Sequence, residues 1–228
     1  GSVVIDAATH TATLPLTAAA GDYVIRVIGT PDATQGIGSF GACVTRDSDP
    51  TPRTCIAADS FSGNIQTPAT PSSTPSSALN TNFTSTTAGI YTVTITDDAF
   101  PVALQSISGG IAAGSTPVAT LAAGATQVTL AAGTSYTLIV GALADATATA
   151  GLYGIRIVDP SGAAIFDYTL PVGTLPPATI VNNTTAQAMG LTLSDLAYPA
   201  ALSAVGVAVT EGSSSLAKLT APGSLANF

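Results

Sequence analysis

Apolar and polar residues alternate along much of the chain, with the two-residue period of a β-strand. β-Branched and aromatic side chains occupy every second position in these segments, which suits strands with one buried and one exposed face. Charged residues do not recur along one face at the 3.6-residue spacing of an amphipathic helix. We therefore predict strands at residues 11–16, 23–28, 91–95, 127–130, 136–140, 153–158 and 204–209.

Turn signals separate these segments at short spacing. They include Gly21-Asp22, Pro31-Asp32, Asp159-Pro160-Ser161-Gly162 and Glu211-Gly212. Many short strands joined by such turns indicate an all-β fold of immunoglobulin-like or jelly-roll-like sandwiches. We find no segment suited to a crossover helix of a parallel sheet, although residues 194–203 are compatible with one short helical turn.

Two segments of the sequence return in similar form. Ile95–Leu104 reads ITDDAFPVAL, and Leu193–Leu202 reads LSDLAYPAAL. The offset is 98 residues here, and further matches follow the same offset to Leu121 and Leu219. Earlier in the chain the offset is 113 residues, and these pairs are Tyr23 with Tyr136, Phe40 with Tyr153, and Gly38-Ser39-Phe40-Gly41 with Gly151-Leu152-Tyr153-Gly154. Such internal similarity is typical of an array of self-similar modules.

The change of offset places a 15-residue insertion in the first copy, between Phe40 and Phe100. This interval holds both cysteines and the Thr/Pro/Ser-rich stretch near residues 66–77, so we expect the insertion to be a surface loop. We predict two homologous sandwiches, at residues 1–120 and 121–228. The sequence stops where a third copy would begin, as expected of a piece cut from a longer array or of a terminal strand lent to another subunit.

The charge of the chain excludes some partners. Of 228 residues only 8% are charged, against roughly 25% in ordinary soluble domains. The net charge is −8, and five residues are basic. Such a chain has no basic patch for a phosphate backbone or an anionic membrane surface. Its mean hydropathy of +0.48 is high, yet glycines and prolines interrupt every long apolar run, so we predict no transmembrane helix.

Cys43 and Cys55 flank a Pro- and Asp-rich stretch and are the two cysteines of the chain. We predict that they form a disulfide closing this loop, which in the chain-entropy model contributes roughly 3 kcal/mol. A metal site and free thiols are the alternatives, but two cysteines without a nearby histidine are too few ligands for zinc. If it forms, the disulfide implies an oxidising, extracellular or periplasmic setting.

Acidic pairs occur at Asp47-Ser48-Asp49 and Asp97-Asp98. A calcium site needs six to eight oxygen ligands, and the Asp-X-Asp-X-Asp-Gly pattern is absent. Asp97 has a counterpart in Asp195, and both precede an aromatic-Pro pair. We therefore predict a repeated turn device, in which the carboxylate accepts hydrogen bonds from nearby backbone amides. We predict no metal and no cofactor.

Three asparagines, Asn82, Asn182 and Asn183, match the N-glycosylation pattern. In a Thr-rich chain such matches arise by chance, and a bacterial source would leave them unoccupied. The Thr/Pro/Ser stretch resembles extended, O-glycosylated linkers. Attached sugar is thus one alternative for these positions, and unmodified surface side chains are the other.

No constellation of catalytic residues is visible in the sequence. His10 is the single histidine, and it lies in an expected N-terminal strand. A Gly-X-Ser-X-Gly elbow and a phosphate-binding Gly-Lys-Ser/Thr motif are absent. Asp residues mostly occupy turns, and Glu211 is the one glutamate, so a facing carboxylate pair of the glycosidase type is not indicated. We predict that the chain is not an enzyme.

A Gly-Tyr strand, a Gly-aromatic-Gly strand, an Asp-X-Ala-aromatic-Pro-X-X-Leu segment and a closing apolar strand follow one another in each copy. This order resembles the repeat modules of secreted bacterial surface proteins. Residues 18–27 and 130–140 also resemble pre-peptidase C-terminal β-sandwich domains. The resemblance covers about a quarter of the chain and implies an extracellular accessory role, without assigning any functional residue.

These observations predict an extracellular or cell-surface structural protein, a subunit of a bacterial filament or adhesin stalk. We expect copies of the chain to assemble head to tail by β-strand addition, with no nucleic acid partner and no membrane insertion. The alternative is a β-sandwich that binds carbohydrate or another ligand; ice binding is disfavoured because Thr has no fixed short period. The expected strand donors are Val3, Val4, Ile5, Leu14, Leu16, Leu225 and Phe228.

Overall fold

The computed structural model describes residues 11–31, 37–46, 60–66, 76–148, 150–173, 175, 178–220 and 224–225. Every regular element in these ranges is a β-strand, and none of them contains a helix able to cross a membrane. The strands are β1 (Thr11–Ala18), β2 (Gly21–Thr30), β3 (Ile37–Arg46), β4 (Ser60–Gln66), β5 (Ser76–Ser85), β6 (Gly89–Asp97), β7 (Ser106–Ala113), β8 (Thr116–Ala122), β9 (Gly124–Leu130), β10 (Thr134–Leu143), β11 (Ala150–Val158), β12 (Ala164–Gly173), β13 (Thr179–Asn183), β14 (Gln187–Asp195), β15 (Ala204–Glu211), β16 (Ser214–Thr220) and β17 (Ser224–Leu225).

All seven predicted strands are present, so the period-two pattern located them correctly. The suggested helical turn within residues 194–203 is wrong. This segment contains the end of β14 and then an irregular loop. The loop is held by a side-chain carboxylate rather than by helical hydrogen bonds.

The chain forms two β-sandwiches, which confirms the predicted fold class, but their boundaries differ from the predicted ones. Unit 1 comprises residues 1–71, 175–211 and 215–228, and unit 2 comprises residues 72–174 and 212–214. The expected division at residue 120 cuts through unit 2. The reason is that strands far apart in the sequence pair to build unit 1, while unit 2 lies between them in the chain.

The sequence repeat divides the chain into four consecutive blocks of strands. We call them block A (β1–β4), block B (β5–β8), block C (β9–β12) and block D (β13–β17). Strands β9–β11 of block C repeat β1–β3 of block A at the offset of 113 residues, and β12 takes the place of β4 beside them. Block D repeats block B at the offset of 98 residues. Unit 1 combines blocks A and D, whereas unit 2 combines blocks B and C.

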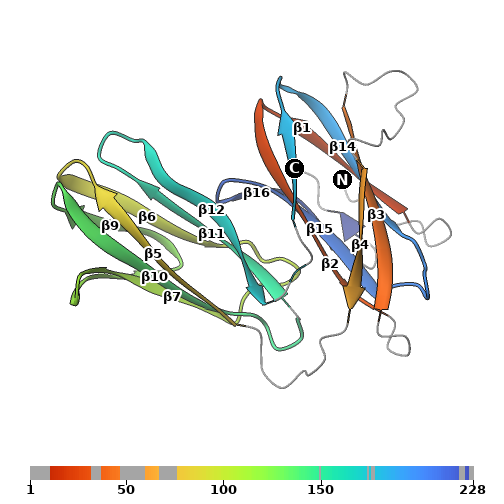
Figure 1. Ribbon diagram of the computed structural model, residues 1–228, viewed down its shortest axis with the longest axis horizontal. Coiled ribbons are helices and arrows are strands. Elements are labelled where there is room, and N and C mark those ends of the chain that lie inside the picture. The colour runs from red at the N-terminus through yellow and green to blue at the C-terminus, as the bar shows by residue number, and fades with distance from the viewer. Residues whose placement is uncertain are drawn as a thin grey trace. The chain divides into compact units, whose positions relative to one another are not determined.

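The two units have equivalent sheets. Unit 1 has the strand orders β1-β14-β3-β4 and β13-β2-β15-β16-β17, and unit 2 has β9-β6-β11-β12 and β5-β10-β7-β8. Replacing each strand by its repeat counterpart converts the first pair of orders into the second, apart from β17. In Figure 1 the red and orange strands of block A alternate with the blue strands of block D, while unit 2 runs from yellow to teal. The repeated sequence thus produces a repeated topology.

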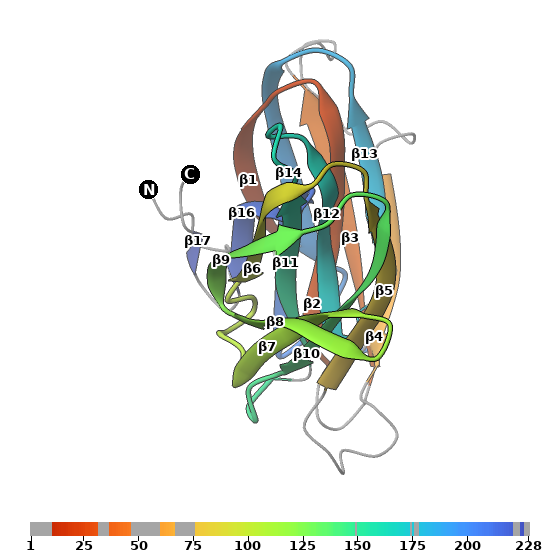
Figure 2. The same cartoon turned by 90° about the vertical axis from the view of Figure 1, so that its left-hand side faces the viewer.

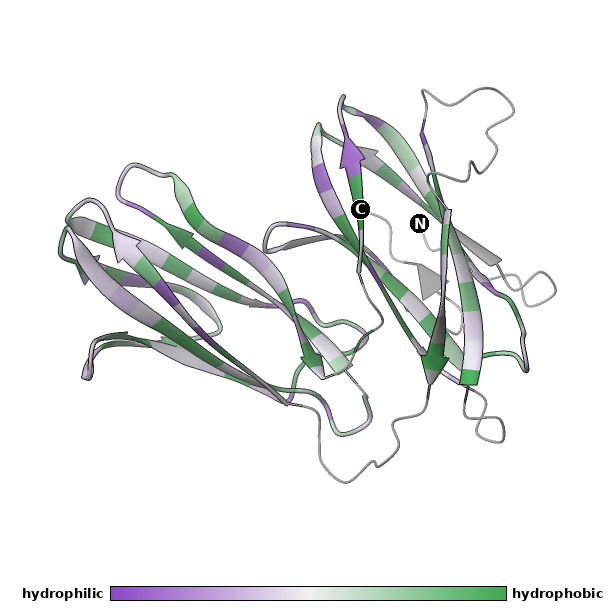
Figure 3. Cartoon of the chain, viewed as in Figure 1, coloured by the Kyte–Doolittle hydropathy of each residue, from purple (hydrophilic) through white to green (hydrophobic). Residues whose placement is uncertain are grey.

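Each unit has its own apolar core between its two sheets, as the alternating colours along the strands in Figure 3 indicate. Unit 1 buries Tyr23 and Phe40, and unit 2 buries Tyr91 and Tyr153. Tyr23 Oη donates to the carbonyl of Ala19 at 3.0 Å. In unit 2, Tyr91 Oη of β6 likewise donates to a carbonyl four residues earlier, that of Thr87, at 2.8 Å. Each of these two phenols thus has a polar partner at the end of its strand. Figure 2 shows the sheet of β6, β9, β11 and β12 in unit 2.

The residues predicted to lie in donated strands fall into three groups in the structure. Leu14 is buried and Leu16 half-buried in β1, where they pair with Leu191 and Met189 of β14 in the same chain. In this conformation they are therefore not free to join another subunit, because they complete the core of unit 1. Leu225 lies in β17, paired with Leu219 of β16. The remaining predicted donors, Val3, Val4, Ile5 and Phe228, lie outside the described residues.

Candidate functional site

The repeated Asp-aromatic-Pro segment forms a compact loop after β14, which we call the aspartate loop of unit 1 (residues 195–202). Asp195 Oδ1 accepts a hydrogen bond from Ala197 N at 2.8 Å, and Oδ2 accepts one from Leu202 N at 2.9 Å. Ala197 has a positive φ of 51°, a conformation that costs energy for a residue with a Cβ. The carboxylate offsets this cost by binding two backbone amides, at positions two and seven residues further along the chain.

The aspartate loop of unit 2 (residues 97–104) has the same geometry. Asp97 Oδ1 accepts from Ala99 N at 2.8 Å and Oδ2 accepts from Leu104 N at 2.9 Å, and Ala99 has a φ of 47°. The predicted turn device is thus confirmed at both positions. Within the residues that the structure describes, no group of three or more His, Cys, Asp or Glu side chains could hold a metal ion.

Each aspartate loop places a leucine over a glycine of the other block of its unit. A Cβ added at Gly38 of β3 would lie 2.2 Å from Leu202 Cδ2, and one at Gly151 of β11 would lie 2.5 Å from Leu104 Cδ2. Only a residue without a side chain permits such close approach. The loop therefore clasps block D to block A in unit 1, and block B to block C in unit 2.

The two aspartate loops differ in exposure. In unit 2, Asp98 is 3% exposed and Phe100 is fully buried. In unit 1, their counterparts Leu196 and Tyr198 are 51% and 73% exposed. The loop of unit 1 thus presents an aliphatic and an aromatic side chain to solvent, at the positions where unit 2 buries its side chains under other residues of the chain.

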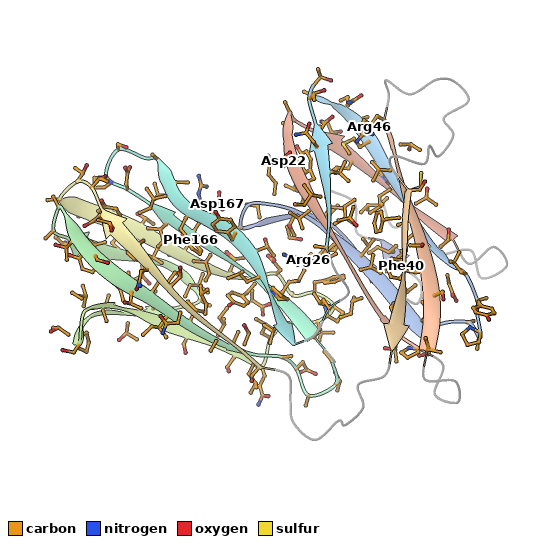
Figure 4. All side chains as sticks on the ribbon, viewed as in Figure 1. Asp22, Arg26, Phe40, Arg46, Phe166 and Asp167 are labelled. Carbon is orange, nitrogen blue, oxygen red and sulfur yellow. The ribbon has the colours of Figure 1, made fainter. Side chains whose placement is uncertain are left out.

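A second surface feature lies at the edge of unit 1, where β13 and β4 end their respective sheets. A cavity of about 270 Å³ opens there, and Ile180 beside it is 69% exposed. Figure 4 shows Arg46 at this end of the unit and Phe40 between the sheets. The lining residues come from three strands and are Arg46, Ser60, Phe61, Thr179, Ile180, Val181 and Asn182.

The corresponding edge of unit 2 is closed more fully. Its strand β5 has ten residues where β13 has five, and β5 makes contact with β12. The tyrosine of β12, Tyr168, is 57% exposed and packs edge-on against Phe166, with ring centroids 4.8 Å apart. Arg156 and Asp167 form an ion pair at 3.7 Å on the neighbouring positions of β11 and β12.

The three asparagines of the glycosylation pattern are placed differently. Asn82 and Asn182 are exposed, and Asn82 Oδ1 accepts a hydrogen bond from Thr137 Oγ1. Asn183 is 1% exposed, and its Nδ2 donates to the carbonyls of Ala18 and Ala19, the latter at 2.6 Å. A glycan on Asn183 is incompatible with this folded state, because the sugar would replace a buried hydrogen-bond donor.

The cysteines and the histidine are described only in part. Cys43 is buried in β3 at 8% exposure, while Cys55 lies outside the described residues, so the disulfide remains a prediction. His10 and the acidic pair near Asp47 also lie outside them.

Two exposed turns hold their aspartates in the ionised form. Hydrogen bonds from the side chain and backbone of Thr147 lower the pKa of Asp145. Donors in the turn after β11, led by the Ser161 hydroxyl, lower the pKa of Asp159. Burial and the nearby charge of Glu211 raise the pKa of Tyr23. The two aspartate shifts thus follow from local turns, and the tyrosine shift follows from burial and from a carboxylate distant in sequence.

Comparisons with known proteins add little. No family model and no curated protein matches the chain. Among solved structures, the chain is similar to a GH2 β-galacturonidase from Eisenbergiella tayi, bound to glycerol in one structure (10% identity) and to galacturonate in another (9%). In both cases 95% of this chain is covered, with a TM-score of 0.22. The chain spans about two fifths of those chains, 42% and 43%, and so weak a likeness supports no conclusion about activity.

Proposed function

We propose that this chain is an extracellular structural protein, the subunit of a surface filament or stalk in which copies join head to tail. The observation that carries the proposal is the exposed aspartate loop of unit 1. Leu196 and Tyr198 are more than half exposed there, while the equivalent positions in unit 2 are buried.

In the proposed assembly, a surface of a second copy covers the exposed Leu196 and Tyr198 of unit 1. Their counterparts in unit 2, Asp98 and Phe100, are already buried within one chain. A contact of this kind joins two different surfaces of the subunit, so each addition leaves one loop uncovered and the assembly does not close. Open, non-closing contacts produce fibres.

Other observations agree with a structural role. The strongest sequence signals, the aspartate loops and their glycine partners, serve to hold sheets together. The proposal assigns the chain no catalytic step and no cofactor. Secretion, the predicted disulfide and assembly at the cell surface belong to the proposal as well.

The proposal is tested by changing the exposed tyrosine. We expect the purified chain to assemble as its concentration rises, and Tyr198→Asp to raise the concentration needed roughly ten-fold or more, because buried interface tyrosines often contribute that much. Tyr168→Asp is the matched control, since Tyr168 is also exposed but lies on β12. Light scattering and negative-stain micrographs measure the outcome. A chain that stays monomeric at every concentration, with no fibres in micrographs of native material, contradicts the proposal.

Carbohydrate binding is the second candidate, favoured by the exposed Tyr168 of β12, which packs against the half-buried Phe166. Tyr168 is 57% exposed and is steadied by Phe166, as aromatic rings that stack on sugars are. Binding on a glycan array that Tyr168→Ala abolishes would support it. Absence of binding across the array would leave the structural role alone.

A further inference from the structure

Neither block of unit 1 can complete a sheet by itself. Among the described strands of block A only β3 and β4 pair with each other, since β1 pairs with β14, and β2 pairs with β13 and β15. Within block D, β15, β16 and β17 are neighbours, but β13 and β14 pair with strands of block A. Each block therefore leaves unpaired strand edges until it meets its complement.

The core of unit 1 is shared equally between the two blocks. Of the eighteen buried core residues that the structure describes, nine come from each block. Val27 of β2 and Val207 of β15 illustrate the sharing, because they are direct cross-strand partners and are 2% and 0% exposed. Separating the blocks would expose both halves of this core to water. Pairing of each block with a complement is therefore favoured by the free energy of burying this apolar surface.

Polar contacts fix how the two blocks fit. Leu196 N donates to the carbonyl of Ser39 at 2.9 Å, and Ser203 N donates to that of Thr30 at 2.8 Å. In unit 2 the repeat counterparts of these residues make the same two bonds.

One buried polar contact differs between the units. Asn183 binds Ala19 in unit 1, and its place is taken in unit 2 by Ser85, which binds Ala131. Because the two side chains differ in length and in donor geometry, each suits the backbone of its own complement. Such differences at buried polar positions favour cognate pairing of block A with block D.

We propose that block A of one copy pairs with block D of a second copy, so that unit 1 is built between two chains. This inference rests on the proposed function only in that the partner is another copy of this chain. Every strand pair and core contact of unit 1 would be reproduced, because the second copy carries an identical block D. In the resulting linear assembly, which we call the string, block D of each copy pairs with block A of the next copy. Blocks B and C, the repeat counterparts of blocks D and A, pair in the same way to build unit 2 within one chain.

The balance between the closed chain and the string depends on concentration. In the closed chain, block D reaches block A at an effective concentration set by the two connections through unit 2. At low protein concentration closure within one chain is favoured, and at high concentration pairing between copies competes with it. Exchange of identical elements adds no new interface, so the cost is confined to opening unit 1.

A complementation experiment with full-length chains tests the exchange directly. One variant carries Val27→Asp, which damages block A, and the other carries Val207→Asp, which damages block D, since a lone buried carboxylate is costly. Refolded together, the two variants retain one intact block A and one intact block D on different chains. We expect light scattering to detect a complex of one copy of each variant, absent from either variant alone. The double variant Val27→Asp/Val207→Asp mixed with Val27→Asp is the control and should give no complex.

A second measurement keeps the proposal testable if these variants fold poorly. Thr17 and Ala188 are exposed register partners across the pairing of β1 with β14. A Thr17→Cys/Ala188→Cys chain oxidised in dilute solution is locked closed. We expect the same variant oxidised at high concentration to give disulfide-linked multimers on a non-reducing gel, and the chain locked in dilute solution to give none when it is concentrated afterwards. Oxidation at high concentration that links no chains overturns the exchange.

The two proposals fail in different ways. If wild-type chains form fibres while the mixed variants form no complex and oxidation at high concentration links no chains, the exchange is wrong and the structural role remains. If the mixed variants form the complex but wild-type chains form no fibres, the exchange is correct and the filament role is wrong.

Discussion

Asp97 and Asp195 show how much of the repeat depends on one side chain. Each carboxylate binds two backbone amides and holds an alanine at positive φ. The sequence identified both residues, because an Asp before an aromatic-Pro pair recurs at a fixed offset. It could not show that the loops clasp one block of a sandwich to another, because the glycines beneath Leu104 and Leu202 are distant in sequence.

Removal of one carboxylate should weaken only the unit that contains it. We expect Asp195→Ala to lower the free energy of unfolding of unit 1 by about 2 kcal/mol, since two hydrogen bonds to a charged group are lost. Asp97→Ala should do the same to unit 2. Hydrogen exchange of the β14 and β6 amides in urea measures the two units separately. Equal loss in both units, or no loss in either, would show that the loops are not local clasps.

The lowered pKa of Asp159 predicts acid sensitivity in unit 2. A carboxyl group whose pKa is lower in the folded chain contributes stability that is fully present above its unfolded value, about 3.8. This contribution is lost as the pH falls through the lower, folded value. We expect Asp159→Asn to flatten the dependence of unit 2 stability on pH below about 4. Thermal unfolding from about pH 2 to about pH 5 tests this, with unit 1 in the same sample as the control.

At the scale of elements, the period-two pattern predicted strand positions well because each strand has one face toward a core. The exposed residues at the edge of unit 1 were not predicted. Ile180 is 69% exposed because it lies on the outward face of β13, where Val181 and Asn183 face inward, and β13 ends its sheet. Whether a strand is central or lies at an edge is decided by pairing, which periodicity does not encode.

The glycine beneath each aspartate loop predicts a specific intolerance. We expect Gly38→Ala to destabilise unit 1 by about 1–3 kcal/mol, because the new methyl group would overlap Leu202. Adding Leu202→Ala should recover some of the loss. Gly41→Ala on the same strand is the control, since its Cβ would lie at an ordinary 3.4 Å from Leu196. Urea unfolding of unit 1 is the measurement, and equal effects at both glycines would contradict the close contact.

At the scale of the whole molecule, the sequence revealed two kinds of repeated block but not how they pair. Offsets of 113 and 98 residues identify blocks A and C as equivalent, and blocks B and D likewise. Pairing block A with block B is compatible with the same pattern and gives the predicted division at residue 120. The structure pairs block A with block D instead. The choice depends on contacts between residues more than a hundred positions apart, such as Leu14 with Leu191.

The order of the four blocks also has a consequence during protein synthesis. Block A leaves the ribosome first, yet its complement is translated after the whole of blocks B and C. Throughout that interval, nascent block A lacks its complement and can meet a finished block D released from a neighbouring ribosome on the same messenger RNA. Translation rate and ribosome spacing would then influence how many chains mature closed and how many mature already linked.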